Sequence, residues 1–461
     1  MSPAATGTGT GARGPASAGG GPTGLAARQA ALQALTRVEE DGAWSNLAVP
    51  EAITHLGAPR DRAFAAHLAD EALRWEGTLD AALELVLSRP LTAVEPALRR
   101  VLRLGALQLL VSDVPARAAV DTSVQLARRA VPGRRSAGAG GFVNGVLRAL
   151  ARRGADLDWP DPAQDPVGHL ALSTAHPRWI VEDLLARYGV ERTGAILAAD
   201  DVAPGVTLRV VGDRDALLAE LRAAGIEARA GAAPASVRAP GADPRTLPAV
   251  VEGRAVVQDE ASMRVALATG ASQGDRVLDL CAGPGGKATH LAQLVGEQGH
   301  VTAVELHRHR ARLITEAAAR QGVGIEVVVG DARTPPVAAD ARFDVVLLDA
   351  PCTGLGTGRR RPEVRWRRTP EDAAELARLQ DELLRAAARR VAPGGQLTYA
   401  VCTWTAAETI EVVERFAPVA ADAGLVATGW TQLLPDTDDT DGMFIATWRA
   451  GRPGRSPSGP R

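Results

Sequence analysis

The 461-residue sequence predicts a multidomain protein in which an all-α region, a small α+β region and an α/β domain follow one another. Three observations predict this order. Residues 25–153 carry apolar side chains at the three- and four-residue spacing of amphipathic helices. Residues 169–270 mix helical patterns with short strand-like ones. Beyond residue 270, strand-like and helical runs alternate, which indicates a parallel sheet covered by helices.

The domain boundaries follow changes in composition. The segment "DLDWPDPAQDPVG" is polar and rich in proline and aspartate, which is typical of a linker. Both ends of the chain are rich in small residues, so we expect disordered tails there. The expected divisions are a tail (1–24), an all-α domain (25–155), a linker (156–168), an α+β subdomain (169–270), an α/β domain (271–450) and a second tail (451–461).

The helical region is interrupted at prolines and glycines, which mark expected helix ends. Counted over residues 25–153, 17 arginines stand against 13 aspartates and glutamates, so the expected surface is mildly basic. The helices we expect in this region include 25–42, 59–88, 96–111 and 142–153.

The rest of the chain alternates between the two kinds of element. In the α+β region we expect helices at 177–189 and 214–226 and strands at 205–211 and 254–261. In the α/β domain we expect a helix at 371–391 and strands at 275–280, 300–305, 325–330, 343–349, 394–401 and 442–449.

Composition excludes several classes of protein. No uncharged apolar run approaches the ~18 residues that a membrane span needs, and the N-terminus lacks the apolar centre of a signal peptide. Three cysteines are too few for a disulfide framework, and no His/Cys cluster has zinc spacing. We therefore expect a cytoplasmic protein without a metal. The net charge of −2 does not by itself indicate a nucleic-acid partner.

A glycine-rich turn follows the first strand of the α/β domain, in "VLDLCAGPGGKATHLAQL". Gly283, Gly285 and Gly286 permit positive φ and a close approach of the backbone to a ligand, and the next helix offers free N–H groups. A P-loop is excluded, because its first glycine and its final Ser/Thr would fall on Cys281 and Ala288.

The same turn leaves other interpretations open. The dinucleotide fingerprint G-x-G-x-x-G/A fits residues 283–288, and Glu305 lies about 20 residues further on, as that motif requires. A nicotinamide enzyme, or a glycine turn without a ligand, therefore stays possible from the turn alone. Three acidic residues at expected strand ends favour a nucleoside cofactor, because they would meet at the carboxyl edge of the sheet: Asp279, Glu305 and Asp331.

Two cysteines end neighbouring strands of the expected sheet. Cys352 follows "FDVVLLDAP", and Cys402 ends "GGQLTYAV". Free cysteine usually packs as a small apolar residue, but the chain's three cysteines all fall on the edge of the glycine turn, which favours reactivity. A thiolate can add to carbon 6 of a pyrimidine, so that carbon 5 accepts a methyl group from a sulfonium. Lys287, the only lysine, could help ionise a thiol, and Asp349 could hydrogen-bond the ring.

Several motifs resemble those of RNA cytosine-5 methyltransferases that use S-adenosyl-L-methionine. The resemblance rests on "DLCAGPGGKATH", "DAPCTGLGTGRRRPEVRW", "GGQLTYAVCTWTAAE" and "DGMFIA". "FVNGVLRAL" and the helical region resemble the NusB-like RNA-binding domain. The combination is similar to the bacterial Sun/Fmu type, which methylates small-subunit (16S) ribosomal RNA. The resemblance implies a NusB-like domain, then a Rossmann-like class I methyltransferase domain.

The resemblance also implies roles for particular residues. Cys402 would be the nucleophile, Cys352 would assist release of the methylated RNA, and Asp349 would lie between cofactor and base. Glu305 would hold the ribose and Asp331 the adenine. The remaining implied cofactor loop is Cys281, Ala282, Gly283, Pro284, Gly285, Gly286 and Lys287.

The chain departs from the family pattern beside the nucleophile. Val401 stands where the family commonly has threonine, Thr403 keeps the hydroxyl of a common serine, and Trp404 is bulky. In DNA cytosine methyltransferases, the cysteine at the position of Cys352 is the nucleophile instead. These departures leave open how the thiol of Cys402 is held in line with a base.

The run "GRRRPEVRWRR" (358–368) places six arginines and Trp366 after the Cys352 loop, where they could contact phosphates and stack on a base. A solvated charge run is the alternative. We expect small-subunit rRNA as partner and a monomer, although the sequence does not determine the oligomeric state. A tRNA substrate, or a non-catalytic RNA-binding or antitermination protein with a relic cofactor site, stays open.

Overall fold

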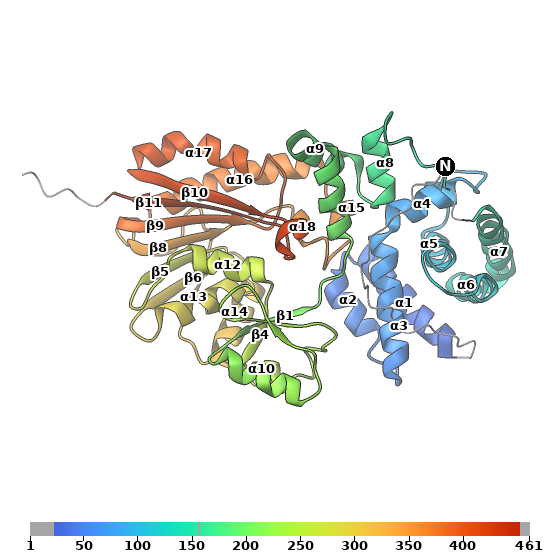
Figure 1. Cartoon of the computed structure of the whole chain (residues 1–461), viewed down its shortest axis with the longest axis horizontal. Coiled ribbons are helices and arrows are strands. Elements are labelled where there is room, and N and C mark those ends of the chain that lie inside the picture. The colour runs from blue at the N-terminus through green and yellow to red at the C-terminus, as the bar shows by residue number, and fades with distance from the viewer. Residues whose placement is uncertain (1–22, 155–156, 452–461) are drawn as a thin grey trace, which may run out of the picture. The chain divides into compact units, whose positions relative to one another are not determined.

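The computed structural model describes residues 23–154 and 157–451 (Figure 1). It separates into two compact units, Met1–Ala175 and His176–Arg461. The expected tails lie almost entirely outside the described residues, although the first helix already begins at Thr23. No helix among the described residues has both the length and the apolar character needed to cross a membrane.

Helices make up the described part of the first unit. They are α1 (Thr23–Glu40), α2 (Ser45–Ala52), α3 (Pro59–Arg74), α4 (Glu76–Glu84), η1 (Leu91–Ala93), α5 (Pro96–Leu110), α6 (Ala116–Ala130), η2 (Gly133–Arg135), α7 (Ser136–Arg153) and α8 (Pro166–Ser173).

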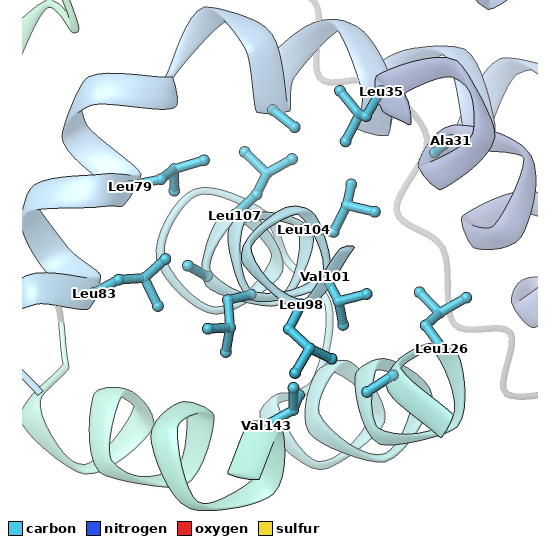
Figure 2. Packing of buried hydrophobic residues seen from close by; sticks show 14 of the residues in the cluster. Ala31, Leu35, Leu79, Leu83, Leu98, Val101, Leu104, Leu107, Leu126 and Val143 are labelled. Carbon is cyan, nitrogen blue, oxygen red and sulfur yellow. The ribbon is translucent and has the colours of Figure 1, made fainter. Parts of the chain in front are cut away.

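Helix α5 lies at the centre of this unit. Figure 2 shows its Leu98, Val101, Leu104 and Leu107, which recur every three residues and point among the side chains of the surrounding helices. All four are nearly or completely buried, and each fully buried aliphatic side chain stabilises the fold by about 1.5–3 kcal/mol. The helical periodicity of the sequence therefore identified the core of this unit.

Two boundaries of the first unit differ from the expected ones. The single helix expected at 59–88 is broken at Trp75, which has φ −90° and ψ 11° and ends α3 where α4 begins. The expected linker 156–168 also ends early. Helix α8 starts at Pro166, and the Thr78 hydroxyl of α4 donates to the carbonyl of Leu172 over 2.5 Å. Because of this packing, the boundary between the units lies after residue 175 rather than after residue 168.

The second unit begins with two helical segments that meet at Gly189, where φ is 73° and ψ is 172°, and continues into a small antiparallel sheet of strand order β2-β3-β1-β4. The sheet includes two short strands, β2 and β3, that the sequence did not predict. The elements are α9 (Arg178–Asp200), β1 (Val206–Val210), α10 (Arg214–Ala223), β2 (Arg229–Ala230), β3 (Ser236–Ala239), α11 (Pro248–Val251) and β4 (Ala255–Val257).

The next helix, α12 (Glu260–Ala268), belongs to the large sheet instead of the small one. Its Ala261 and Val265 pack with Val277 and Val345 of the large sheet. The α+β subdomain therefore ends near residue 257, before the expected limit at 270, because the apolar face of α12 is buried against the larger core.

The large sheet has the strand order β10-β11-β9-β8-β5-β6-β7, in which β11 runs antiparallel to its neighbours β9 and β10, and β5 to β9 are parallel to one another. Its elements are β5 (Arg276–Leu280), α13 (Gly286–Val295), β6 (His300–Glu305), α14 (Arg308–Gln321), β7 (Glu326–Val329), β8 (Phe343–Asp349), η3 (Leu355–Thr357), α15 (Val364–Arg367), α16 (Pro370–Ala388), β9 (Val391–Val401), α17 (Ile410–Asp422), β10 (Leu425–Leu433), α18 (Pro435–Asp438) and β11 (Met443–Ala450).

Helices cover both faces of this sheet. Helices α16 and α17 pack on one face, and α12 and α13 on the other (Figure 1). The chain order reverses at β5, which lies between β6 and β8. In sheets of this kind, ligands bind beyond the carboxyl ends of the strands at such a reversal. The glycine-rich turn after β5 lies at that point.

Candidate active site

The turn from β5 to α13 is shaped by two glycines that no other residue could replace without displacing a neighbour. A Cβ at Gly283 would lie 2.3 Å from Oε2 of Glu305, and a Cβ at Gly285 would lie 3.0 Å from Cα of Ile314. Gly285 also has φ +108°, a value that residues with a side chain rarely adopt. The turn thus brings backbone N–H groups at the start of α13 to the carboxyl edge of the sheet.

Glu305, at the end of β6, is buried against this turn. Its Oε2 accepts the amide of Gly283 over 3.0 Å, and its Oε1 accepts the amide of His307 over 3.0 Å. Arg310 donates to the Gly283 carbonyl over 2.6 Å and lies 3.7 Å from the Glu305 carboxylate. The carboxylate that the sequence assigned to a ribose is therefore connected directly to the glycine turn.

Asp279, in β5, is fully buried, and neither carboxylate oxygen has a hydrogen-bond partner within the described residues. Burial and the neighbouring Asp349 raise its pKa well above the usual range, although Lys287 opposes them. A buried carboxylate without a partner is unfavourable, so this position is suited to a ligand that carries positive charge or hydrogen-bond donors.

Asp331 lies beside the end of β6 but does not contact Glu305 in the described structure. The amide of Gly330 donates to the Glu305 carbonyl over 3.1 Å, which fixes the start of the turn. The Asp331 side chain is 34% exposed and pairs with Arg333, whose Nη2 lies 2.7 Å from Oδ2. This pairing lowers the pKa of Asp331. The structure thus leaves Asp331 more accessible than Glu305.

The structure brings the two predicted thiols into contact. Sγ of Cys352 lies 3.4 Å from Sγ of Cys402, and both side chains are half-buried. They meet because β8 and β9 are adjacent parallel strands, in which Asp349 pairs with Ala400. The Gly356 amide also donates to the Cys402 carbonyl over 3.0 Å and closes the loop that carries Cys352.

The two thiols differ in acidity. The hydrogen bond from Cys352 lowers the pKa of Cys402, against burial and Asp349, and with help from the cations Lys287 and Arg361. The same hydrogen bond raises the pKa of Cys352 well above its usual range, together with burial and nearby negative charge. Of the two thiols, Cys402 therefore has the lower pKa, and the thiolate is the nucleophilic form of cysteine.

Lys287 and Asp349 form an ion pair beside the thiols, with Nζ 2.8 Å from Oδ2. Burial alone would lower the pKa of Lys287, but Asp349 and the thiolate of Cys402 raise it, so the side chain stays cationic. Cys281, the third cysteine, lies in the turn with φ +65°. Burial and the surrounding carboxylates raise its pKa, so Cys281 is less reactive than Cys402.

The unusual neighbours of Cys402 are packed inside the protein. Val401 and Trp404 are almost completely buried. The ring of Trp404 lies so close to Gly442 that a Cβ there would be 2.7 Å from it, and the Trp404 carbonyl accepts a hydrogen bond from Arg187 of α9. Trp404 therefore anchors the loop that follows β9, and Val401 is packed at the end of the strand.

Sequence reasoning assigned no role to Glu408, a fully buried carboxylate near the start of α17. It accepts hydrogen bonds from Thr353 and Thr405, and so connects the loops that carry the two thiols. The only sequence signal was a charged residue six positions after Cys402, within a motif already quoted. A single glutamate near a helix start does not reveal such a contact.

The arginine run 358–368 is not the exposed RNA contact that its composition suggested. Arg359 and Arg365 are buried, and Arg360 pairs with Asp259 and Asp441 over 2.6 and 3.1 Å. Arg365 lies 2.6 Å from Asp200 and 2.7 Å from Asp201. Half of the run's six arginines thus form internal ion pairs, and Trp366 is partly buried. The prediction of an RNA surface here was wrong for these side chains.

No group of three or more His, Cys, Asp or Glu side chains that could hold a metal ion occurs among the residues for which the structure is described.

Three family models match the chain in order: the NusB family at residues 25–152, the ferredoxin-like domain of RsmF/B-like methyltransferases at 176–240, and the 16S rRNA methyltransferase RsmB/F model at 266–449. A Pseudomonas putida protein named ribosomal RNA small subunit methyltransferase B is 34% identical, with 91% of this chain and 97% of that protein covered. The chain belongs to the RsmB/F methyltransferase family.

Other relatives agree with this assignment. A Mycobacterium tuberculosis protein named only as a methyltransferase is 42% identical over 92% of this chain and 96% of its own length. The solved structure of PH0851 superposes with a TM-score of 0.81 at 25% identity, and covers 93% of this chain and 98% of that one. NSun6 from Pyrococcus horikoshii, solved with the S-adenosylmethionine analogue SFG, shares the fold with a TM-score of 0.54 at 22% identity, over 60% of this chain and 99% of that one.

Membership of the RsmB/F family confirms the predicted fold class, a NusB-type helical domain followed by a Rossmann-like methyltransferase domain. It also decides between the alternatives left open by the glycine turn, because the matched residues 266–449 include the turn and both reactive thiols. The turn therefore belongs to a methyltransferase domain and not to a nicotinamide enzyme.

Proposed function

We propose that this protein transfers a methyl group from S-adenosyl-L-methionine to carbon 5 of a cytosine in small-subunit ribosomal RNA. The observation that carries the proposal is the contact between two thiols of unequal acidity, 3.4 Å apart, beside the ion pair of Lys287 and Asp349. The names of the relatives, ribosomal RNA small subunit methyltransferase B among them, support the choice of RNA.

The residues around the glycine turn suit this cofactor. The unpartnered carboxylate of Asp279 fits its positively charged groups, and the N–H groups at the start of α13 fit its carboxylate. Glu305 would hold the ribose hydroxyls and Asp331 the adenine amino group. When bound, the cofactor supplies the methyl group as an electrophile on a sulfonium.

The chain's own residues would carry out the remaining steps. The thiolate of Cys402 adds to carbon 6 of the cytosine, and the electron pair of the carbon 5–carbon 6 double bond moves toward carbon 5. Asp349 stabilises the ring edge as charge develops there. After carbon 5 has gained the methyl group, its proton passes to a water molecule of the solvent. The electron pair of that C–H bond re-forms the carbon 5–carbon 6 double bond, the carbon–sulfur bond breaks, and Cys402 leaves as a thiolate. Cys352, which holds its proton, assists that release.

The basic charge of the helical unit supports an RNA partner. Residues 116–153 contain 8 arginines and one acidic residue, whereas residues 25–115 contain 9 arginines and 12 acidic residues. All eight arginines are exposed, and such a surface neutralises RNA phosphates. They are Arg117, Arg128, Arg129, Arg134, Arg135, Arg148, Arg152 and Arg153.

The test is methylation of small-subunit rRNA with labelled cofactor. Cys402→Ala should abolish labelling, and Cys352→Ala should accumulate a protein–RNA adduct that survives denaturation. Cys281→Ala is the matched control, because it removes a thiol and leaves both reactive ones in place, so no adduct should persist. An adduct that accumulates in Cys402→Ala instead would show that the two roles are reversed.

The same assay separates the alternative substrates. Labelling of tRNA in preference to rRNA would replace the proposed substrate but keep the chemistry. Cofactor binding without turnover on either RNA would favour a non-catalytic RNA-binding protein. Mapping 5-methylcytosine in rRNA from cells with and without the protein would identify the modified nucleotide.

A further inference from the structure

Glu408 is a buried acceptor with donors on every side. Its Oε1 accepts the Thr353 amide over 2.8 Å and the Gln380 amide group over 3.1 Å. Its Oε2 accepts the hydroxyls of Thr353 and Thr405 over 2.6 and 2.8 Å. Since an N–H group donates to Oε1 and hydroxyls satisfy Oε2, the side chain has the partners that a carboxylate requires. Each lost partner would leave a buried polar group unsatisfied.

The donors of Glu408 come from both thiol-bearing loops. Thr353 directly follows Cys352, and Thr403 directly follows Cys402. Their hydroxyls lie 2.9 Å apart, so the two threonines form a bridge between the loops that ends on the Glu408 carboxylate. Adjacent strands bring the two sulfur atoms to 3.4 Å, and the network centred on Glu408 ties together the residues that follow them.

A second layer holds Glu408 itself in place. The hydroxyl of Tyr399 donates to the Glu408 carbonyl over 2.7 Å, and its oxygen also lies 3.0 Å from the side-chain oxygen of Gln380. Gln380 also donates to the carbonyl of Pro351, the residue before Cys352, over 2.8 Å. The carboxylate therefore has a single position relative to the cysteine pair.

The charges around the two thiols are distributed unevenly. Lys287 and Arg361 act on Cys402 and favour its thiolate, whereas Asp349 disfavours it. The pKa of Cys352 is raised mainly by its hydrogen bond to Cys402 and by burial, and the charges of Glu408 and Asp349 act in the same direction. Glu408 thus adds to the difference in pKa between the two thiols.

We propose that Glu408 is a positioning residue that holds the two thiol-bearing loops together and thereby gives Cys402 and Cys352 their different reactivities. The inference rests on the proposed function, and goes beyond it by naming what assigns the two cysteines their different roles. Glu408 would act through the cysteines and not touch RNA or cofactor.

The test is alkylation of the full chain by iodoacetamide at neutral pH, without RNA or cofactor, with the modified cysteine identified by mass spectrometry. The wild type should be labelled at Cys402 in preference to Cys352. Glu408→Gln keeps the shape and removes the charge. We expect the ratio of Cys402 to Cys352 labelling to fall by about tenfold, the change that follows when two pKa values approach each other by one unit.

Glu260→Gln is the matched control. Glu260 is also a buried carboxylate of the same unit and accepts hydrogen bonds from Ser236 and Arg238, each over 2.8 Å. Among the described residues, Glu260 forms no hydrogen bond with either thiol-bearing loop. Glu260→Gln should therefore retain the wild-type labelling ratio, and an equal change in both variants would attribute the effect to general loosening and overturn the proposal.

Turnover provides a second readout. Glu408→Gln should lower kcat for methyl transfer and leave KM for the cofactor unchanged, because the glycine turn is not part of the network. Where Glu408→Gln fails to fold, Thr353→Val removes the bridging hydroxyl alone and should shift the labelling ratio in the same direction. An unchanged ratio in the folded variant would overturn the proposal. Alkylation requires neither substrate, so this result is independent of whether Cys402→Ala abolishes methylation.

Discussion

Replacement of Arg365 by methionine tests whether the arginine run stabilises the fold or contacts RNA. Arg365 is about 2% exposed and lies 2.6 Å from Asp200 and 2.7 Å from Asp201. Asp200 also faces Nε2 of His176 at 3.3 Å. Arg365→Met keeps most of the side-chain volume but leaves two carboxylates without their main cation.

The structure allows the size of the effect to be estimated. Two hydrogen bonds to charged groups are lost, at about 1.5–3 kcal/mol each, and breaking a buried ion pair by removing one partner costs about 3–5 kcal/mol. We therefore expect the free energy of unfolding of the second unit to fall by about 3–5 kcal/mol near neutral pH. The loss should be smaller in acid, because burial raises the pKa of Asp201 and its carboxylate can take up a proton instead.

The measurements are urea unfolding of the full chain and the salt dependence of rRNA binding. Arg148→Met is the matched control, because Arg148 is exposed on α7 and has no carboxylate partner among the described residues. It should change stability by no more than about 0.5 kcal/mol and reduce the slope of log affinity against log salt by about one. Arg365→Met should leave that slope unchanged. A variant Arg365→Met with wild-type stability and a reduced slope would refute the internal role of this arginine.

Three further outcomes follow from the site. Lys287→Met removes a cation from beside Cys402, so the pH at which Cys402 reaches half of its maximal rate of reaction with iodoacetamide should rise by about one unit. An unchanged midpoint would contradict the role given to Lys287. Gly283→Ala should weaken the binding of S-adenosylmethionine, measured by calorimetry, by about tenfold or more, because the new Cβ would lie 2.3 Å from Glu305. In the control Gly286→Ala the nearest contact of the new Cβ is at 3.8 Å, so the affinity should change far less. Burial and Arg209 lower the pKa of His290 from 6.5 to about 3. Neutral His290 therefore contributes fully to stability above pH 6.5, and this contribution is lost as the pH falls toward 3, by at most about 1.4 kcal/mol per pH unit. His290→Leu should flatten the pH dependence of the unfolding free energy between these two values.

The sequence by itself determined the elements and the edge at which they place the chemistry. Apolar spacing identified most of the chain in α1, α3, α4, α5 and α7 of the first unit and most strands of the large sheet, because periodicity is a local property of the chain. It did not identify α2, α6 or α8. The placement of Cys352 and Cys402 at one edge of the sheet also followed from local reasoning, since parallel strands end at the same edge, but their contact is seen only in the structure. Strand β10 was missed because most of its residues are exposed and lack the apolar pattern of a buried strand.

Only the tertiary structure showed which charged side chains are buried and which partners they have there. Arg365 and Asp200 are 165 positions apart in the chain, and nothing in the run 358–368 indicates that its arginines are paired internally. Glu408 similarly gains its role from Thr353, 55 positions away. The boundary at residue 175 depends on the packing of α8 against α4. The physical reason is the same each time: a charged or polar side chain is compatible with solvent or with a buried partner, and only the folded chain brings the partner within reach.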